Sequence, residues 1–314
     1  MIIVRGKIKW KIAAILIIVI AAISFILVFL RLNGNFKIGK KNSNLPVRRD
    51  SENFVSSQDY IVFDYGNAKD YVEKYFRDNP AGKVNDFQIG ITSHHLPSAA
   101  YFIGDFYQNL GKANDKIFVV VGPDHFESCG GMLLTTQKSF LTPFGILESD
   151  SEIVKKIIES GAIFNDTCFS REHSIAVQAL FIKFLFPDAK IVALLLSANI
   201  DTNTLQNLTN SLKAFGKKIV LIGSVDFSHY RPYEIAASLD AESEKMILNY
   251  DVSAIDLGHV DSPPTIKLLV SLAREWKLKP RILGRANSFN FTGKTEDTTG
   301  YINAIFYAPV GSRD

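Results

Sequence analysis

The clearest candidates for chemistry in this 314-residue chain are its six histidines: His94, His95, His125, His173, His229 and His259. Four of them stand at or just past the carboxyl end of an apolar segment, in the stretches GITSHH, VVVGPDH and IGSVDFSH. A fifth, His173, opens a predicted helix. Because the carboxyl ends of strands in an open α/β sheet meet at one crevice, we expect these side chains to share a site.

Three of these histidines have a carboxylate close before them in the sequence. Asp124 precedes His125, Glu172 precedes His173, and Asp226 lies three residues before His229. Neutral imidazole is the commonest metal ligand in proteins, and its second nitrogen is usually held by a carboxylate or a carbonyl. The pattern therefore favours a shared metal site over a set of unrelated loop histidines.

The elements that must position these residues alternate between strands and helices. Apolar, β-branched runs predict strands at 86–93, 116–123, 190–197, 218–228 and 300–308. Helical patterns lie between them, at 97–111, 150–160, 173–186, 202–215, 234–249 and 264–276. This alternation predicts an α/β sandwich with a largely parallel central sheet flanked by helices.

The N-terminal part of the chain predicts a different kind of structure. A basic tail (1–11) precedes 19 residues without charge (12–30), which at about 1.5 Å per residue nearly cross a bilayer core of roughly 30 Å. No small-residue cleavage site follows, so we interpret 12–30 as a transmembrane anchor rather than a signal peptide. A polar tether (31–58) leads to the folded domain (59–314). Basic residues flank the span on both sides, and we lean toward an extracytoplasmic domain.

Composition excludes some classes of function. The net charge of +3 gives no basis for binding nucleic acid. Two cysteines, Cys129 and Cys168, cannot form a disulfide framework and lack metal-binding CxxC spacing. We interpret them as buried thiols rather than ligands, although a single disulfide between them remains open.

Five short motifs together resemble the Memo family, whose bacterial and archaeal members are called AmmeMemoRadiSam system protein B. In chain order they are SHHLPSAAY, GPDHFES, LTPFG, EHSIAVQ and SVDFSHY. The resemblance covers about residues 86–308. It implies a fold similar to the class III extradiol dioxygenases, with a metal-binding crevice.

The resemblance also implies a set of site residues. The family's two metal histidines fall on His94, favoured over His95 by register, and on His125. The family's other pocket residues fall on His173, Asp226 and His229, for which we expect acid–base roles, with Asp226 orienting His229. We expect Asp124, Glu172 and His95 to support the ligands.

The third ligand departs from the family pattern. Typical Memo proteins place a cysteine there, whereas registration on the helix that follows puts Asp261 at that position. Two histidines and one carboxylate form the ligand set of non-haem Fe(II) oxygenases. We therefore expect Fe(II) held by His94, His125 and Asp261, with zinc or copper as alternatives. The competing interpretation is that Asp261 caps the helix that follows it.

Three functions are compatible with such a pocket. The first is dioxygenase-like oxidation of a small substrate, the second is a non-catalytic module that binds a metal or a small-molecule or peptide ligand, and the third is metal-assisted hydrolysis. Whether the protein is an enzyme stays undecided at this level, because a fold does not determine an activity. The resemblance also implies pathway partners, an AMMECR1-domain protein and a radical SAM protein, and the anchor implies the membrane as a further partner.

Overall fold

The computed structural model describes residues 60–79, 86–111, 116–127, 129–251, 253 and 259–309. The predicted tail, anchor and tether lie outside these residues. No helix within the described part of the chain is long and apolar enough to cross a membrane.

All five predicted strands form, and they lie next to one another in one sheet. They are β2 (Ile89–Thr92), β3 (Ile117–Pro123), β8 (Lys190–Leu196), β9 (Ile219–Ser224) and β11 (Gly300–Tyr307). The described residues add six strands that the sequence patterns did not predict: β1 (Tyr60–Val62), β4 (Leu133–Thr135), β5 (Ser139–Thr142), β6 (Gly145–Ser149), β7 (Ile163–Phe164) and β10 (Lys279–Asn287). The strand order is β1-β5-β6-β8-β3-β9-β2-β11-β10, with β4 and β7 attached beside β8.

The sheet is parallel at its centre and mixed toward its edges. Strands β6, β8, β3, β9 and β2 are parallel neighbours. In contrast, β11 pairs antiparallel with β2 and with β10, and β5 pairs antiparallel with β6. The predicted α/β class with helices around a large central sheet is confirmed, and the part of the sheet that carries the strand-end histidines is parallel.

The six predicted helices also form. They are α3 (Ala100–Gln108), α4 (Ser151–Glu159), α6 (His173–Leu185), α7 (Thr202–Lys213), α8 (Tyr233–Asn249) and α9 (Pro263–Glu275). Not predicted were α2 (Ala68–Asp78), the one-turn helices α5 (Asp166–Phe169) and α10 (Phe289–Thr292), and the 3₁₀ turn η1 (Gly216–Lys218).

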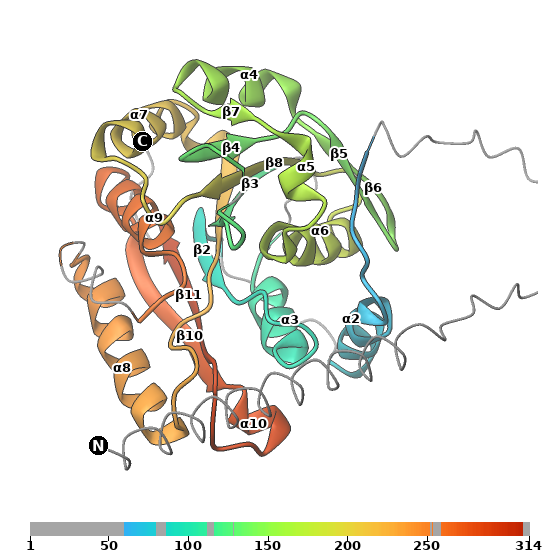
Figure 1. Ribbon diagram of the computed structural model, residues 1–314, viewed down its shortest axis with the longest axis vertical. Coiled ribbons are helices and arrows are strands. Elements are labelled where there is room, and N and C mark those ends of the chain that lie inside the picture. Colours follow the sequence, from blue (N-terminus) through green and yellow to red (C-terminus); the bar gives the residue numbers. More distant parts are fainter. Residues whose placement is uncertain are drawn as a thin grey trace, which may run out of the picture. The chain divides into compact units, whose positions relative to one another are not determined.

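The helices cover both faces of the sheet, as Figure 1 shows, and each face has its own apolar core. Alternate residues of β3 point to opposite faces: Phe118 and Val120 pack with α2, α3 and α6, whereas Val119 and Val121 pack with α4, α7 and α9. Burial on both faces explains why the central strands are continuous apolar runs. It also leaves the strand ends as the place where polar side chains can gather.

Candidate metal centre

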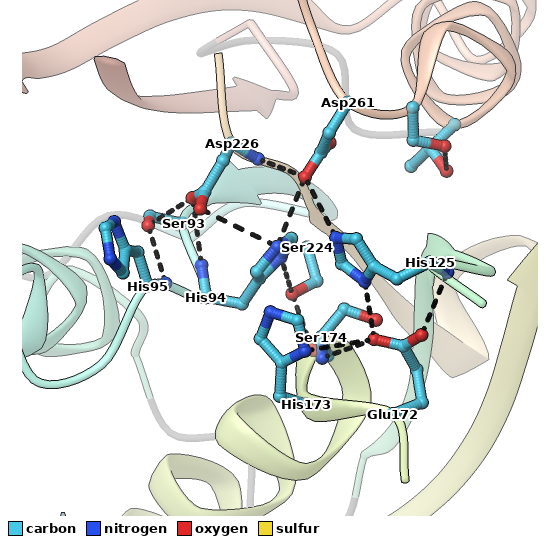
Figure 2. Close-up of polar contacts among 12 residues, drawn as sticks. Ser93, His94, His95, His125, Glu172, His173, Ser174, Ser224, Asp226 and Asp261 are labelled. Carbon is cyan, nitrogen blue, oxygen red and sulfur yellow. Dashed lines mark hydrogen bonds and ion pairs between the residues drawn. The ribbon is translucent and has the colours of Figure 1, made fainter. Parts of the chain in front are cut away.

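The predicted residues come together at the carboxyl ends of three adjacent parallel strands. His94 follows β2, His125 follows β3, and Asp226 follows β9. Asp261 lies just before α9, and Glu172 and His173 stand at the start of α6 (Figure 2). Separate segments, far apart in the sequence, therefore supply one cluster.

One carboxylate oxygen lies between two imidazoles at the centre of the cluster. Asp261 Oδ2 is 3.1 Å from His94 Nε2 and 3.7 Å from His125 Nε2. Asp226 Oδ2 lies 3.6 Å from the same His94 nitrogen. The rings of His94 and His125 stand nearly perpendicular, with centroids 5.1 Å apart. Two ring nitrogens thus face one oxygen from different directions.

A buried hydrogen-bond chain fixes the tautomer of His94. The Ser224 hydroxyl donates to the carbonyl of Ser174 at 2.6 Å, which leaves its oxygen free only as an acceptor. Gln178 Nε2 donates to that oxygen at 2.8 Å, and His94 Nδ1 lies 3.2 Å from it. His94 Nδ1 therefore carries a proton, and Nε2 is the ring nitrogen turned toward Asp261.

Glu172 orients the His125 ring so that its Nε2, like that of His94, points toward Asp261. Its Oε1 lies 2.8 Å from His125 Nδ1, and its Oε2 accepts the backbone N–H of His125 at 3.1 Å. Glu172 is also the N-cap of α6, accepting from the N–H of Ser174 at 3.0 Å. With Nδ1–H donated to a buried carboxylate, His125 turns its Nε2 toward Asp261.

These groups fit a metal ion. Ligand atoms about 2.0–2.2 Å from one metal lie roughly 3–3.5 Å from each other, which is close to the separations at Asp261 Oδ2. The second oxygen of Asp261 is buried and has no hydrogen-bond partner among the described residues, as expected for an atom that needs a cation beside it. His94 with His125 and His173, and His94 with Asp226 and Asp261, form two overlapping sets whose ligand atoms lie within 4.8 Å of one another.

Without a metal, protons take its place. Burial acts to lower the pKa of His125, but hydrogen bonds to Asp261 and Glu172 and their charges outweigh it and raise the pKa to about 10. Burial also opposes charging of His94, yet the carboxylates of Asp226 and Asp261 raise its pKa. The pKa of Asp261 moves the other way: burial raises it, and the imidazoles lower it well below the usual range. The carboxylates of the cluster therefore stabilise positive charge placed between them.

His173 differs from the two central histidines. Burial, together with the charges of His94 and His125, lowers its pKa to about 4, so its ring is neutral near neutral pH. Its ring stacks on that of His125, with centroids 4.5 Å apart, and its Nδ1 lies 3.5 Å from Glu172 Oε1. His173 thus supplies an uncharged polar group beside the central cluster.

The helix-cap interpretation of Asp261 is wrong. The N-cap residue of α9 is Ser262, whose hydroxyl contacts Thr265 Oγ1 at 2.7 Å, and proline occupies the first turn. Asp261 instead accepts a hydrogen bond from the backbone N–H of Asp226 at 3.2 Å, which aims its side chain at the histidines.

Two carboxylates have partners other than those expected from the sequence. Asp124 accepts from the N–H groups of Phe126 and Glu127, so it shapes its own loop rather than supporting His125. Asp226 accepts hydrogen bonds from the Ser93 hydroxyl and from the backbone N–H of His94, at 3.2 Å for the latter. Among the described residues Asp226 makes no ion pair with His229, and it supports the His94 segment instead.

A cavity of about 580 Å³ opens over the cluster. His94, His125, His173 and Asp261 form part of its lining, and His229 and His259 line it as well. The predicted histidines therefore all face one space.

His95 also lines this cavity, and a buried tyrosine holds its ring. Tyr301 Oη lies 2.7 Å from His95 Nδ1, and Ser288 hydrogen-bonds to the same phenol oxygen. Burial, followed by the nearby charge of Asp226, raises the pKa of Tyr301 well above its usual value, so the phenol keeps its proton. Tyr301 therefore holds the His95 ring through Nδ1 and leaves Nε2 as the second polar atom of that ring.

Sequence reasoning missed the residues that orient the ligands. Ser224, Ser174 and Gln178 set the His94 ring, and Tyr301 sets the His95 ring. The first three lie inside the motifs SVDFSHY and EHSIAVQ, so their place in those motifs was a usable signal. Tyr301 was a sequence candidate for closing the pocket, with ordinary packing favoured over that role, but its contact with His95 depends on the sheet order that brings β11 beside β2.

The two cysteines form a disulfide, Cys129–Cys168. The interpretation as buried thiols was therefore wrong, and the alternative of one disulfide is what the structure contains. Cys168 is buried in α5 and Cys129 is half-buried in the loop after β3.

The fold and the site together define an α/β protein with a His/Asp cluster at its strand ends, and sequence comparison names the family. The family model described as Memo-like protein matches residues 64–301. A MEMO1 family protein of Pyrobaculum aerophilum is 29% identical over 210 residues, covering 63% of this chain and 74% of the relative. One of Caldivirga maquilingensis is 29% identical over 219 residues, covering 64% and 76%. The chain belongs to the Memo family.

The similarity of this fold to a solved structure is weak. An uncharacterized protein from Escherichia coli K12 superposes with a TM-score of 0.42 and 12% sequence identity, covering 70% of this chain and 100% of that chain. Similarity at this level does not inform the fold or the function.

Proposed function

We propose that this protein is a membrane-anchored Memo-family metalloenzyme that holds one Fe(II) ion through His94, His125 and Asp261 and oxidises a small substrate with O₂. The observation that carries the proposal is the convergence of the Nε2 atoms of His94 and His125 on one carboxylate, with each ring fixed by a buried partner of its Nδ1. Two histidines and one carboxylate leave coordination positions open, as dioxygenase chemistry requires.

The carboxylate of Asp261 favours Fe(II) over zinc and Cu(I). A cysteine at the third position suits zinc or Cu(I), whereas an aspartate oxygen is a hard ligand. Fe(II) bound at this triad would supply open positions at which O₂ and a substrate with two adjacent oxygens can bind. Insertion of both oxygen atoms of O₂ into the substrate needs no further reductant.

The chain's own residues around the cavity would bind the substrate. His229 and His173 line the cavity from different segments, and the neutral ring of His173 can form a hydrogen bond with a substrate. Nε2 of His95, whose ring is held by Tyr301, would give the substrate a further polar contact. Asp226 holds the backbone of the His94 segment in place.

We further propose that the folded domain lies on the extracytoplasmic side of a membrane. The apolar segment 12–30 would anchor it. The disulfide between Cys129 and Cys168 supports this side, because such bonds persist in oxidising compartments and are rare in the cytosol.

Oxygen consumption tests the enzymatic part of the proposal. The full-length chain, purified in detergent and loaded anaerobically with Fe(II), is mixed with catechol and carboxylated catechols in an oxygen electrode. We expect O₂ uptake equal to substrate loss, abolished in Asp261→Ala and retained in Asp188→Ala, which removes an exposed carboxylate just before β8. Tight catechol binding without O₂ uptake would favour a binding module, and ester hydrolysis by a zinc-loaded protein would favour a hydrolase.

A further inference from the structure

We infer that the disulfide Cys129–Cys168 is a positioning element of the metal centre, which holds His125 against Glu172 and so makes metal affinity depend on its oxidation. The inference rests on the proposed metal site. It concerns two residues that neither the family motifs nor the ligand set includes.

The disulfide lies next to both partners of the key contact. Cys129 is four residues after His125, and Cys168 is four residues before Glu172. The two cysteine Cα atoms are 6.2 Å apart, and the hydrogen bond from His125 Nδ1 to Glu172 Oε1 measures 2.8 Å. The covalent bond and the hydrogen bond therefore join the same two chain segments at neighbouring points.

The remaining ties between these segments are weak. Asn165 donates to the carbonyl of Cys129 at 3.4 Å, and the guanidinium of Arg171 lies over the ring of Phe126, 4.4 Å from its centroid. Phe126 is 43% exposed, and a cation–π contact in water contributes little order. Besides these contacts, the N–H of His125 donates to Glu172 Oε2 at 3.1 Å and the His125 ring stacks on that of His173. The disulfide is the covalent tie between the two described segments.

His125 is the ligand that most needs such support. His94 is buried, with its ring held by Ser224 inside the core, and Asp261 is held by the backbone of Asp226. The side chain of His125 is 26% exposed and sits on the loop after β3. That loop continues through Glu127 and Gly130, both with positive φ, rather than through regular structure.

The start of α6, which carries Glu172, is held by close packing in the core and would move little if the disulfide were lost. A Cβ added at Gly122 of β3 would lie 2.5 Å from Ser174 Oγ, so the start of α6 packs directly on the strand that leads to His125. The helix start is therefore fixed by the core, and loss of the disulfide would release mainly the His125 loop. Loss of the partner that orients a ligating histidine typically weakens metal binding about 10–100-fold.

The experiment measures Fe(II) affinity in two redox states of the full-length chain in detergent. Metal-free protein, oxidised or reduced with a phosphine, competes under argon with a chromophoric chelator for Fe(II). We expect reduction to weaken affinity about 10–100-fold, and reoxidation to restore it. The variant Cys129→Ser with Cys168→Ser should match the reduced protein and should not respond to the phosphine.

Two further readouts separate positioning from a general structural role. Circular dichroism should show the reduced protein still folded, and the Co(II)-substituted protein should change its visible spectrum on reduction, since an imidazole leaves the metal. If reduction changes neither the Fe(II) affinity nor the Co(II) spectrum, this inference is overturned but the proposed metal centre is not. Two free thiols in the air-purified protein, or loss of the helical signal on reduction, would overturn it as well. An oxidised protein that binds no Fe(II) would overturn the metal centre itself.

Discussion

By register on the helix that follows it, Asp261 falls where we expect typical Memo proteins to have a cysteine. The backbone N–H of Asp226 holds its carboxylate, and the two metal-facing histidine nitrogens point at one of its oxygens. The choice of metal at this site therefore depends on the hardness of a single side chain.

Replacing that oxygen by sulfur tests this dependence. In Asp261→Cys we expect the metal preference of the site to move from Fe(II) toward zinc and Cu(I), because thiolate is a softer ligand than carboxylate. Competitive loading from an equimolar mixture, followed by mass spectrometry of the bound metals, measures the change. The isosteric Asp261→Asn should lose most binding of every metal, because it removes the charge, and equal iron in all three proteins would refute the assignment.

The pKa of His125 gives the site a predictable response to pH. Burial opposes charging, but hydrogen bonds and charges from Asp261 and Glu172 raise its pKa to about 10, above its unfolded value of about 6.5. A metal must displace this proton, so apparent affinity should rise about tenfold per pH unit, for each displaced proton, up to about pH 10. Chelator competition between about pH 6 and 9 checks this, and a flat profile would contradict it.

The same pKa makes a separate prediction for the metal-free protein. A pKa raised on folding contributes stability that is fully present below about pH 6.5 and is lost as pH rises through about 10. Metal-free protein should therefore unfold at lower denaturant concentration at high pH. The metal-loaded protein should respond less, because the metal replaces the proton.

Among the elements, β3 and α6 pack closely against each other at the site. A Cβ at Gly122 would overlap the Ser174 side chain, so Gly122→Ala should push the start of α6 away and cost about 1–3 kcal/mol. Because Glu172 moves with that helix start, metal affinity should fall too. Val121→Ala, on the other face of β3, should cost about 2 kcal/mol without changing metal affinity. Equal metal affinity in the two variants would contradict the account.

How far the sequence predicts these elements depends on their burial. The central strands and the long helices were predictable because burial on two faces, or on one stripe, leaves a strong apolar period. Strands such as β7, with both Ile163 and Phe164 exposed, and the short β1 leave no such pattern. The antiparallel β10 was missed because its residues are mostly half-buried and mixed in character.

The site was predictable to a similar degree. The strand-end positions of His94 and His125 follow from local sequence, and Asp261 followed from register on a helix. The pairing of Glu172 with His125, rather than with a neighbour in sequence, depends on how α6 packs on β3. Local sequence cannot specify such a contact, because it joins segments 47 residues apart.

At the scale of the whole molecule, we propose a membrane anchor joined to a disulfide-containing domain. We expect the full chain to sediment with membranes after alkaline carbonate washing, and a chain that lacks residues 1–30 to be released, because the 12–30 segment is long enough to insert. Thiol labelling of intact cells and of lysates should find Cys129 and Cys168 oxidised in both. Free thiols in intact cells would place the domain on the cytosolic side.

The most direct test of the central claim is metal content. The full-length chain, Asp261→Ala and Asp188→Ala are purified anaerobically after growth with iron, zinc and copper supplied, and bound metals are counted by mass spectrometry. We expect near-stoichiometric iron in the parent chain and in Asp188→Ala, and a sharp loss in Asp261→Ala. Absence of bound metal from all three proteins, or equal iron in all three, would contradict it.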